Sequence, residues 1–257
     1  MRLDVYLTDR GYTKSREAAQ RLIKEGAVRI GGRPAKKPSE QIDETAAQVI
    51  EVSDSLKYVS RGGLKLERAL DVFDVDVKGL LAVDIGASTG GFTDCLLQRG
   101  IKSVRCVDVG RSQLDKKLGS DPRVTSFEGM NARYLTPDDI GGRCDIAVCD
   151  VSFISLTLII PAVRAVLKDG GRFIALIKPQ FEAGRAALDR HGIVKDRAVH
   201  VGVIEKVIDF AAGEGLECAA LTASPIEGGD GNREYLALFD SKGGFDRNKI
   251  KEIVFGK

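Results

Sequence analysis

From residue 80 onward, the hydrophobic positions of the chain gather into short apolar runs separated by segments with helical spacing. Apolar runs of four to six residues that end at glycine or polar residues are typical of buried strands. We expect strands at 81–85, 104–109, 124–127, 146–149, 172–177, 217–221 and 235–239, with helices at 92–99, 112–118, 155–167 and 197–213. This alternation predicts an α/β fold in which helices cover both faces of a mostly parallel, seven-stranded sheet.

The pattern differs over the first 60 residues. Apolar side chains recur at helical spacing from Leu3, and Ser15 is placed as the N-cap of a second helix that Gly26 ends. A short strand at 27–30 is expected to pair with the extended segment at 48–52. These features predict a small α+β domain, a helix pair on a small sheet.

The two patterns divide the chain into a small and a large domain. Between them lie two adjacent glycines, Gly62 and Gly63, and then apolar residues at helical spacing. We therefore expect a small domain at 1–60, a linker and helix at 61–79 and a large domain at 80–257.

Charge is distributed unevenly along the chain. Residues 1–37 hold ten basic and four acidic side chains, so this segment carries +6, whereas the whole chain carries only +2. A basic module on a slightly acidic body favours a polyanionic partner, because phosphate neutralisation releases counterions. An ordinary solvated helix face would give the same excess of Lys and Arg, so charge alone leaves both interpretations open.

Composition argues against a metal site and a membrane anchor. The five cysteines are an odd number without metal-finger or redox spacing, and the chain has only two histidines. The longest mostly apolar stretch, 151–163, is shorter than the roughly 18 residues that a bilayer span requires. Acidic residues interrupt the first ten positions, unlike a secretory signal. We expect a cytoplasmic protein with no metal and no membrane contact.

A glycine-rich turn follows the first expected strand of the large domain. Dinucleotide-binding turns carry glycine at the position that Ser88 occupies, so a pyrophosphate is disfavoured and S-adenosylmethionine is favoured. A glycine turn without a ligand and a nicotinamide oxidoreductase remain the alternatives. The candidate cofactor-binding residues of this turn are Asp84, Gly86, Ser88, Gly90 and Gly91.

Residues at the ends of later strands extend the candidate cofactor site. Asp108 closes the second strand, 22 residues after Gly86, where a carboxylate can accept hydrogen bonds from both hydroxyls of a ribose. Met130 and Asn131 follow the third strand and are placed to touch an adenine. Asp150 ends the fourth strand, so it is expected at the same edge of the sheet. Ligands of such sheets lie beyond the carboxyl ends of the strands, which makes Asp150 a candidate for the same site.

Charged residues near this edge are candidates for catalysis. Asp150 is not followed by the Pro-Pro-aromatic sequence of amine methyltransferases, and Cys149 lacks the preceding proline of cytosine-carbon enzymes. Lys178 ends an apolar strand, where a lysine is costly to bury unless carboxylates face it, although a surface lysine would also fit there. Lys65 and Glu234 are further residues of suitable type.

The N-terminal segment resembles the S-four (alpha-L) RNA-binding domain over about residues 1–60. The resemblance rests on Arg-Leu-Asp at 2–4, Ser15-Arg16, Ile-Lys-Glu-Gly at 23–26, Val28-x-Ile30-x-Gly32 and Lys-Pro-Ser at 37–39. It implies recognition of RNA shape and phosphates. The RNA-contact candidates that it implies are Arg16, Arg21, Lys24, Arg29, Lys36 and Lys37.

A second resemblance covers about residues 1–240. Lys65, Asp150, Lys178 and Glu234 match the Lys-Asp-Lys-Glu tetrad of FtsJ-like ribose 2′-O-methyltransferases. Ser-Arg-Gly-Gly-x-Lys-Leu, Cys-Asp-Val-Ser-Phe-Ile-Ser and Ile-Lys-Pro-Gln-Phe-Glu make the whole chain similar to the TlyA family, also called the hemolysin A family.

The resemblance implies a Rossmann-like, S-adenosylmethionine-dependent methyltransferase that modifies a ribose 2′-hydroxyl of ribosomal RNA, with cytidine as the family's target. Its partner would be ribosomal RNA within subunits or ribosomes. We hypothesise that neutral Lys178 accepts the proton of the hydroxyl, while Asp150 and Glu234 orient the two amines. The alternatives are a non-catalytic RNA-binding or assembly factor and, less favoured, a membrane-active hemolysin.

Overall fold

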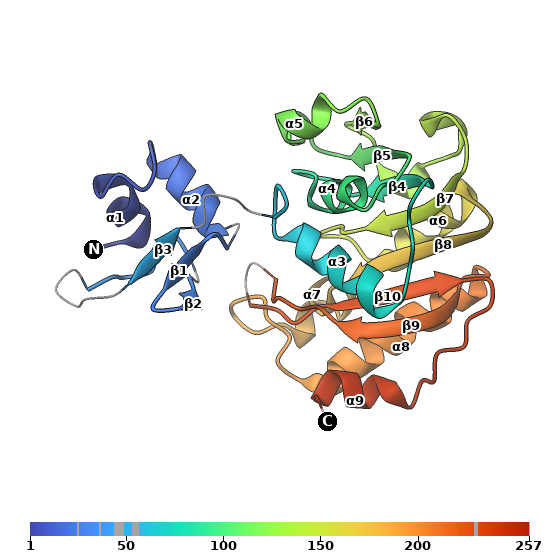
Figure 1. Cartoon of the computed structure of the whole chain (residues 1–257). Helices are drawn as coiled ribbons and strands as arrows, with labels where there is room; N and C mark the ends of the chain where they lie inside the picture. Colours follow the sequence, from blue (N-terminus) through green and yellow to red (C-terminus); the bar gives the residue numbers. More distant parts are fainter. Residues whose placement is uncertain (25, 36, 44–48, 53–56, 229–230, 257) are drawn as a thin grey trace. The chain divides into compact units, whose positions relative to one another are not determined.

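The computed structural model divides the chain into two compact units, Met1–Arg61 and Gly62–Lys257 (Figure 1). The helix that follows Arg61 belongs to the second unit. The structure describes residues 1–24, 26–35, 37–43, 49–52, 57–228 and 231–256.

The first unit packs two helices on a three-stranded antiparallel sheet of order β2-β1-β3. The Ser15 hydroxyl accepts the Ala18 N–H at 3.2 Å and so caps the second helix, as predicted. Gly26 follows that helix with φ of +77°, a conformation that favours glycine. The predicted strand pairing is confirmed, and β2 is an addition to it. The elements are α1 (Leu3–Asp9), α2 (Arg16–Lys24), β1 (Val28–Ile30), β2 (Arg33–Pro34) and β3 (Ile50–Val52).

The second unit is built on a seven-stranded sheet of order β6-β5-β4-β7-β8-β10-β9 (Figure 1). All neighbouring strands from β6 to β8 run parallel, whereas β10 is antiparallel to both β8 and β9. The predicted α/β class and strand number are therefore confirmed. The strands are β4 (Leu81–Ile85), β5 (Ser103–Asp108), β6 (Val124–Glu128), β7 (Cys144–Cys149), β8 (Leu167–Ile177), β9 (Glu217–Ala223) and β10 (Tyr235–Asp240).

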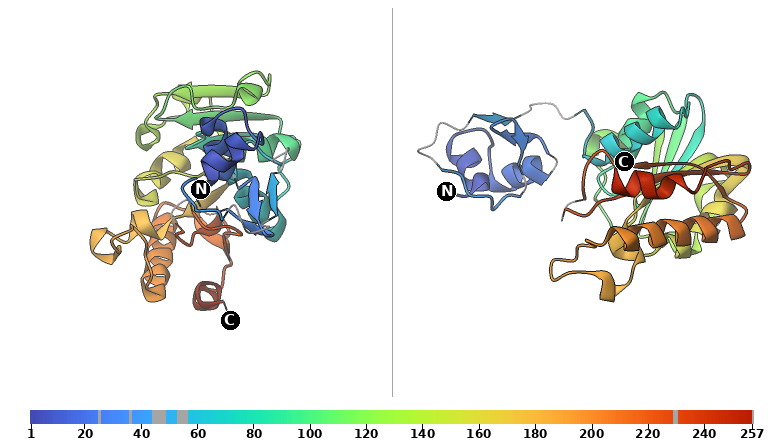
Figure 2. Two further views of the ribbon diagram at one scale, coloured as in Figure 1. Left: turned by 90° about the vertical axis from the view of Figure 1, so that its left-hand side faces the viewer. Right: turned by 90° about the horizontal axis from the view of Figure 1, so that it is seen from below.

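Helices cover both faces of this sheet, as the views of Figures 1 and 2 show. On β4, Val83 and Ile85 join the buried apolar cluster formed with α6 and α8, whereas Asp84 points to α4 on the opposite face. This alternation follows from the two-residue period of a strand. The helices are α3 (Gly62–Val72), α4 (Gly91–Gln98), α5 (Lys116–Gly119), α6 (Ile160–Val166), α7 (Pro179–Glu182), α8 (Arg197–Gly213) and α9 (Lys249–Phe255), with 3-10 turns at Ala132–Tyr134, Asp138–Ile140, Leu156–Leu158 and Arg185–Ala187.

Two predicted helices are wrong in their bounds. The helix expected at 112–118 is only α5, because Ser112 has φ of +54° and Asp115 caps the helix by accepting the Lys117 N–H at 2.9 Å. The helix expected at 155–167 is split into a 3-10 turn and α6. Strand β8 then begins at Leu167, five residues before the predicted start at 172.

The described part of the chain contains no helix long and apolar enough to cross a membrane. Within the same residues, no group of three or more His, Cys, Asp or Glu side chains is arranged to hold a metal ion. All five cysteines are buried.

Candidate active site

The glycine turn after β4 brings two loops into contact. Gly86 has φ of +80°, and its N–H donates to the carbonyl of Val107 at 2.8 Å. A Cβ atom at this position would lie 2.7 Å from the backbone oxygen of Asp150, closer than real Cβ contacts. Glycine is therefore required both for the backbone conformation and for the approach of the loop after β7.

The carboxylate of Asp108 is fixed at the edge of this turn. Its Oδ2 accepts the N–H of Ser88 at 2.8 Å, and its Oδ1 accepts the N–H of Gly110 at 2.7 Å. Ser88 adopts a left-handed backbone with φ of +48°, which is uncommon for a residue with a side chain. Two backbone donors therefore set the orientation of the Asp108 carboxylate beside the glycine turn.

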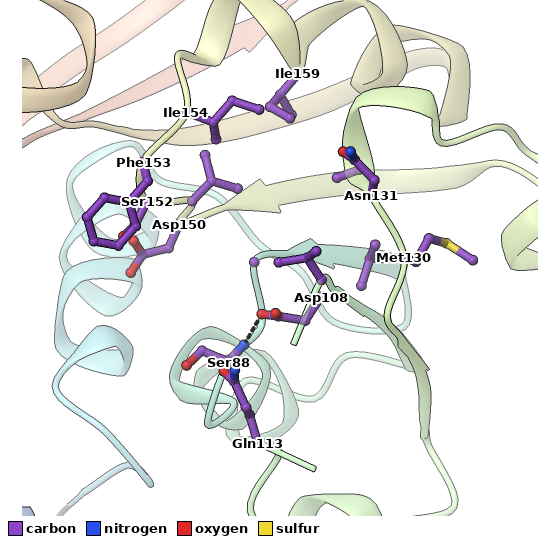
Figure 3. A pocket seen from close by; sticks show the side chains of 15 residues that line it. Ser88, Asp108, Gln113, Met130, Asn131, Asp150, Ser152, Phe153, Ile154 and Ile159 are labelled. Atoms are coloured by element: carbon purple, nitrogen blue, oxygen red, sulfur yellow. Dashed lines mark hydrogen bonds between the residues drawn. The ribbon is translucent and has the colours of Figure 1, made fainter. Parts of the chain in front are cut away.

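A cavity of about 500 Å³ lies between these loops (Figure 3). Five of the predicted cofactor-binding residues line it: Gly86, Ser88, Asp108, Asn131 and Asp150. The side chains of Met130, Ile154 and Ile159 contribute an apolar wall. Further lining residues that sequence reasoning did not propose are Val107, Val109, Gln113, Ala132, Val151, Ser152 and Phe153.

The remaining cofactor candidates, Asp84, Gly90 and Gly91, do not line this cavity. Asp84 is buried, and its Oδ2 accepts the hydroxyl proton of Thr93 at 2.6 Å. Its Oδ1 finds no hydrogen-bond partner among the described residues. Burial, opposed in part by the Thr93 hydrogen bond, raises the pKa of Asp84 to about 7. Gly90 has φ of +96° and starts α4, so its role in the turn is conformational.

Two lysine–carboxylate pairs with buried amines lie where the strands end. Lys178 Nζ is 2.6 Å from Asp150 Oδ1, and Lys65 Nζ is 2.6 Å from Glu234 Oε2. Tyr235 pairs with Ile177 in the antiparallel register of β10 and β8, so Glu234 and Lys178 are the next residues on two adjacent strands. The fold therefore brings the four residues of the predicted tetrad to one edge of the sheet, as two close ion pairs.

Burial makes the charges in these pairs depend on their partners. Lys65, Lys178 and Glu234 are all buried, and a buried charge is stable only when it is paired and hydrogen-bonded. Lys178 also donates to the Ser152 hydroxyl at 2.9 Å. The amine of Lys178 is thereby held beside the cavity that Asp150 and Ser152 line.

The loops after β7 and β8 are joined by further contacts. The Phe153 and Phe181 rings lie 5.0 Å apart between centroids, and the buried Glu182 accepts the Leu156 N–H at 2.7 Å and the Ser155 hydroxyl proton. Phe153 is 91% exposed and has φ of +64°. Sequence reasoning did not select it, although its place in the loop that follows β7 is the signal that could have done so.

The first unit has a different charged cluster, centred on Asp4. Its buried carboxylate accepts two hydrogen bonds from Arg2, at 2.9 and 2.8 Å, one from Arg16 at 3.1 Å and one from Gln20 at 2.9 Å. These bonds, those from Arg2 most strongly, hold the pKa of Asp4 well below its usual range. Arg16, a predicted RNA contact, is thus oriented by an acid.

The other RNA-contact candidates are placed less fully. Arg29 is exposed on β1 and donates to the Gly32 carbonyl at 2.9 Å, and Lys37 is exposed as well. Arg21 and Lys24 belong to α2, but their side chains are not described. Lys36 lies outside the described residues.

Fold and site together define a methyltransferase of the Rossmann-like class. A model of the FtsJ-like methyltransferase family matches residues 58–241, and a model of the S4 domain matches residues 1–47. The chain therefore belongs to the FtsJ-like methyltransferase family and carries an N-terminal S4 domain. This membership overturns the interpretation as a nicotinamide oxidoreductase.

Relatives match nearly the whole chain. "Putative rRNA methyltransferase YqxC" from Bacillus subtilis is 50% identical over 91% of this chain and 84% of its own length. "16S/23S rRNA (cytidine-2'-O)-methyltransferase TlyA" from Mycobacterium tuberculosis is 42% identical, over 91% of this chain and 88% of its own length. The solved structure named "Putative hemolysin from Streptococcus thermophilus" has 45% identity and a TM-score of 0.79, covering 100% of this chain and 94% of that one.

Proposed function

We propose that this protein transfers a methyl group from S-adenosylmethionine to the 2′-hydroxyl of a cytidine in ribosomal RNA. The FtsJ-like family supports methyl transfer, and the M. tuberculosis relative supports the cytidine and the ribosomal substrate. Such a substrate implies a cytoplasmic protein. The observation that carries the proposal is the contact of Lys178 Nζ with Asp150 Oδ1 at 2.6 Å, next to the cavity.

The lining of the cavity fits the proposed cofactor. A nucleoside requires an acceptor for its ribose hydroxyls and an apolar slot for its base, and Asp108 and the wall of Met130 and Ile154 have this chemistry. Gly86 leaves room where a Cβ would approach the Asp150 backbone. When bound, S-adenosylmethionine supplies an electrophilic methyl group on a sulfonium sulfur. We assign Gly86, Ser88, Asp108 and Asn131 to holding it, and give Asp84, Gly90 and Gly91 the supporting task of shaping the turn.

The first unit supplies the RNA-binding function in this proposal. The S4 match and the excess of basic residues in 1–37 support contacts to phosphates, which position RNA without reading its sequence. Arg16 and Arg29 expose their side chains on this unit, as does Lys37. We also retain Arg21, Lys24 and Lys36 as proposed contacts.

The chemistry assigned to the tetrad is proton acceptance and orientation. Attack of the ribose oxygen on the methyl carbon forms a C–O bond and breaks the C–S bond, and the electron pair of that bond stays on sulfur. In this proposal, the unprotonated form of Lys178 accepts the proton released by the hydroxyl, and the ammonium that results is the charged partner of Asp150 in the ion pair. Glu234 holds Lys65 of α3, and Glu234 precedes β10 where Lys178 follows β8 on the adjacent strand.

A non-catalytic RNA-binding or assembly factor is the main alternative. Such a factor would not require two buried lysine–carboxylate pairs, which cost desolvation free energy unless chemistry uses them. The pairs therefore favour catalysis. A membrane-active hemolysin has support only from the names of some relatives, including the S. thermophilus structure.

The test is transfer of a radiolabelled methyl group from S-adenosylmethionine to purified ribosomal RNA, ribosomal subunits and intact ribosomes. We expect label in RNA, and resistance of one phosphodiester bond to alkaline hydrolysis, because a 2′-O-methyl group blocks attack by that oxygen. Asp108→Asn, which weakens the acceptor for the cofactor ribose, should lower the affinity for the cofactor. RNA binding without any incorporation of label on all three substrates would favour the non-catalytic factor.

A further inference from the structure

Ser152 contacts Lys178, the proposed proton acceptor, but is not a member of the tetrad. Lys178 Nζ has two close partners among the described residues: it forms an ion pair with Asp150 Oδ1 at 2.6 Å and donates a hydrogen bond to Ser152 Oγ at 2.9 Å. The nitrogen of a lysine is tetrahedral, so it has three directions besides its bond to Cε. The hydrogen bond to Ser152 sets one of those directions.

We propose that Ser152 is a positioning residue for the reaction: its hydrogen bond, together with the ion pair to Asp150, orients the Lys178 amine toward the reacting hydroxyl. This inference rests on the proposed function. The ion pair alone would leave the amine free to turn beside the carboxylate, whereas the added hydrogen bond sets its direction. Asp150 and Ser152 both line the cavity, so their contacts hold the amine beside a group bound there (Figure 3).

The backbone around Ser152 is held in a conformation that it would not adopt on its own. Phe153 has φ of +64°, a strained value for a bulky residue, which persists only when the surroundings enforce it. Two contacts link this loop to the segment after β8: the ring of Phe153 lies beside that of Phe181, and Glu182 accepts the Leu156 N–H. Strain of this kind is concentrated at functional sites. Since Phe181 and Glu182 lie three and four residues after Lys178, the loop that carries Ser152 is connected to the segment that carries the amine.

The same loop offers a matched control. Ser155 lies three residues after Ser152, but its hydroxyl contacts Glu182 and Thr157 rather than Lys178. Removal of the Ser155 hydroxyl takes three hydrogen bonds from the loop, to Glu182, to the Thr157 hydroxyl and from the Thr157 N–H, so it disturbs the loop more than Ser152→Ala does. Only the Ser152→Ala change removes a bond to the amine.

The experiment compares Ser152→Ala, Ser152→Thr and Ser155→Ala with the unsubstituted full chain. Single-turnover methylation of ribosomal RNA is measured at saturating S-adenosylmethionine, with separate measurements of cofactor and RNA affinity. We expect Ser152→Ala to slow the single-turnover rate about tenfold, as loss of one orienting hydrogen bond does, and to change both affinities less than about twofold. Ser152→Thr keeps the hydroxyl and should restore most of the rate. Ser155→Ala should react at nearly the unsubstituted rate.

Three results would overturn the positioning role while the proposed function stands. These are an unchanged rate for Ser152→Ala, an equal loss in Ser155→Ala, and a loss in Ser152→Ala that appears only as weaker cofactor or RNA binding. An unsubstituted protein that binds RNA and cofactor but transfers no methyl group would instead overturn the proposed function, and this inference with it.

Discussion

The charged clusters of the two units differ in whether their cations are exposed or buried. Around Asp4, the acid is buried and its cations reach solvent, with the side chains of Arg2 and Arg16 43% and 51% exposed. Around the proposed catalytic residues, the cations are buried, with the side chains of Lys65 and Lys178 10% and 9% exposed. The same residue types therefore form an outward-facing positive surface in one unit and an inward-facing pair of amines in the other.

This difference matches what each unit is proposed to do. An exposed guanidinium held by a buried acid keeps its charge and its hydration, and can exchange water for phosphate. A buried amine has lost its hydration, so its protonation and direction depend on the few groups around it. The buried acid fixes the direction of exposed guanidinium groups that are proposed to bind RNA. The buried amine is instead the group that is proposed to react.

The largest loss of stability should follow from breaking a buried pair. Lys65→Ala leaves Glu234 as a buried, unpaired carboxylate, which we expect to destabilise the second unit by about 3–5 kcal/mol. Thermal unfolding followed by circular dichroism measures this change. The double variant Lys65→Met with Glu234→Gln should recover much of the stability, because no charge is then left unpaired.

A matched control is the more exposed pair of Lys168 and Asp145, whose Nζ and Oδ1 lie 2.7 Å apart with side chains 44% and 28% exposed. Lys168→Ala should cost no more than about 1 kcal/mol. If Lys65→Ala were no more costly than this control, burial would not distinguish the two kinds of pair.

A smaller, pH-dependent loss should follow from Asp4→Asn. Because Arg2 and its other partners lower the pKa of Asp4, the unfolded chain binds more protons than the folded one in acid. The stabilisation is therefore complete above the unfolded pKa of about 4 and is lost as pH falls toward the lower folded value. We expect a cost of about 1–3 kcal/mol at pH 7 that shrinks in acid.

Hydrogen exchange in peptides from residues 1–43, measured from pH 7 to about pH 2, isolates the first unit for this test. The protection lost in Asp4→Asn should be nearly constant from pH 7 to about pH 4 and should shrink below that pH. A constant difference across the pH range would show that the charge of Asp4 does not stabilise the unit.

The smallest effect should be on RNA binding by single exposed cations. Arg29→Ala removes one proposed phosphate contact, so the slope of log affinity against log salt should fall by about 1. Arg164→Ala, which removes an exposed cation of α6, is the matched control and should leave the slope unchanged. Equal slopes for all three proteins would remove Arg29 from the RNA surface.

The sequence predicted those elements of the fold whose apolar residues are regularly spaced. The buried strands and the helix at 197–213 were found because their apolar spacing is long and regular, and the seven strands were predicted with the correct class. The segment 112–118 was misread because its helix begins only at Lys116, after the cap Asp115 and a left-handed Ser112 that no periodicity indicates. Similarly, nothing in the spacing marks the end of α6 and the start of β8 at Leu167.

The part of the candidate site that lies at the ends of parallel strands could be predicted. Asp108, Asp150 and Lys178 stand at strand ends, so parallel topology brings them to one edge of the sheet. Ser152 and Phe153 depend on a left-handed turn and on contacts with a distant segment, which a linear pattern does not encode. For the same reason the sequence could not reveal that Asp4 orients Arg16.

The account depends most on the amine of Lys178 as acceptor of the hydroxyl proton. Its most direct test is single-turnover methylation of ribosomal RNA by Lys178→Ala, with S-adenosylmethionine saturating and its binding measured separately. We predict a rate lower by a factor of about 100 or more, with cofactor affinity close to that of the unsubstituted protein. An undiminished rate with normal cofactor binding would contradict the account.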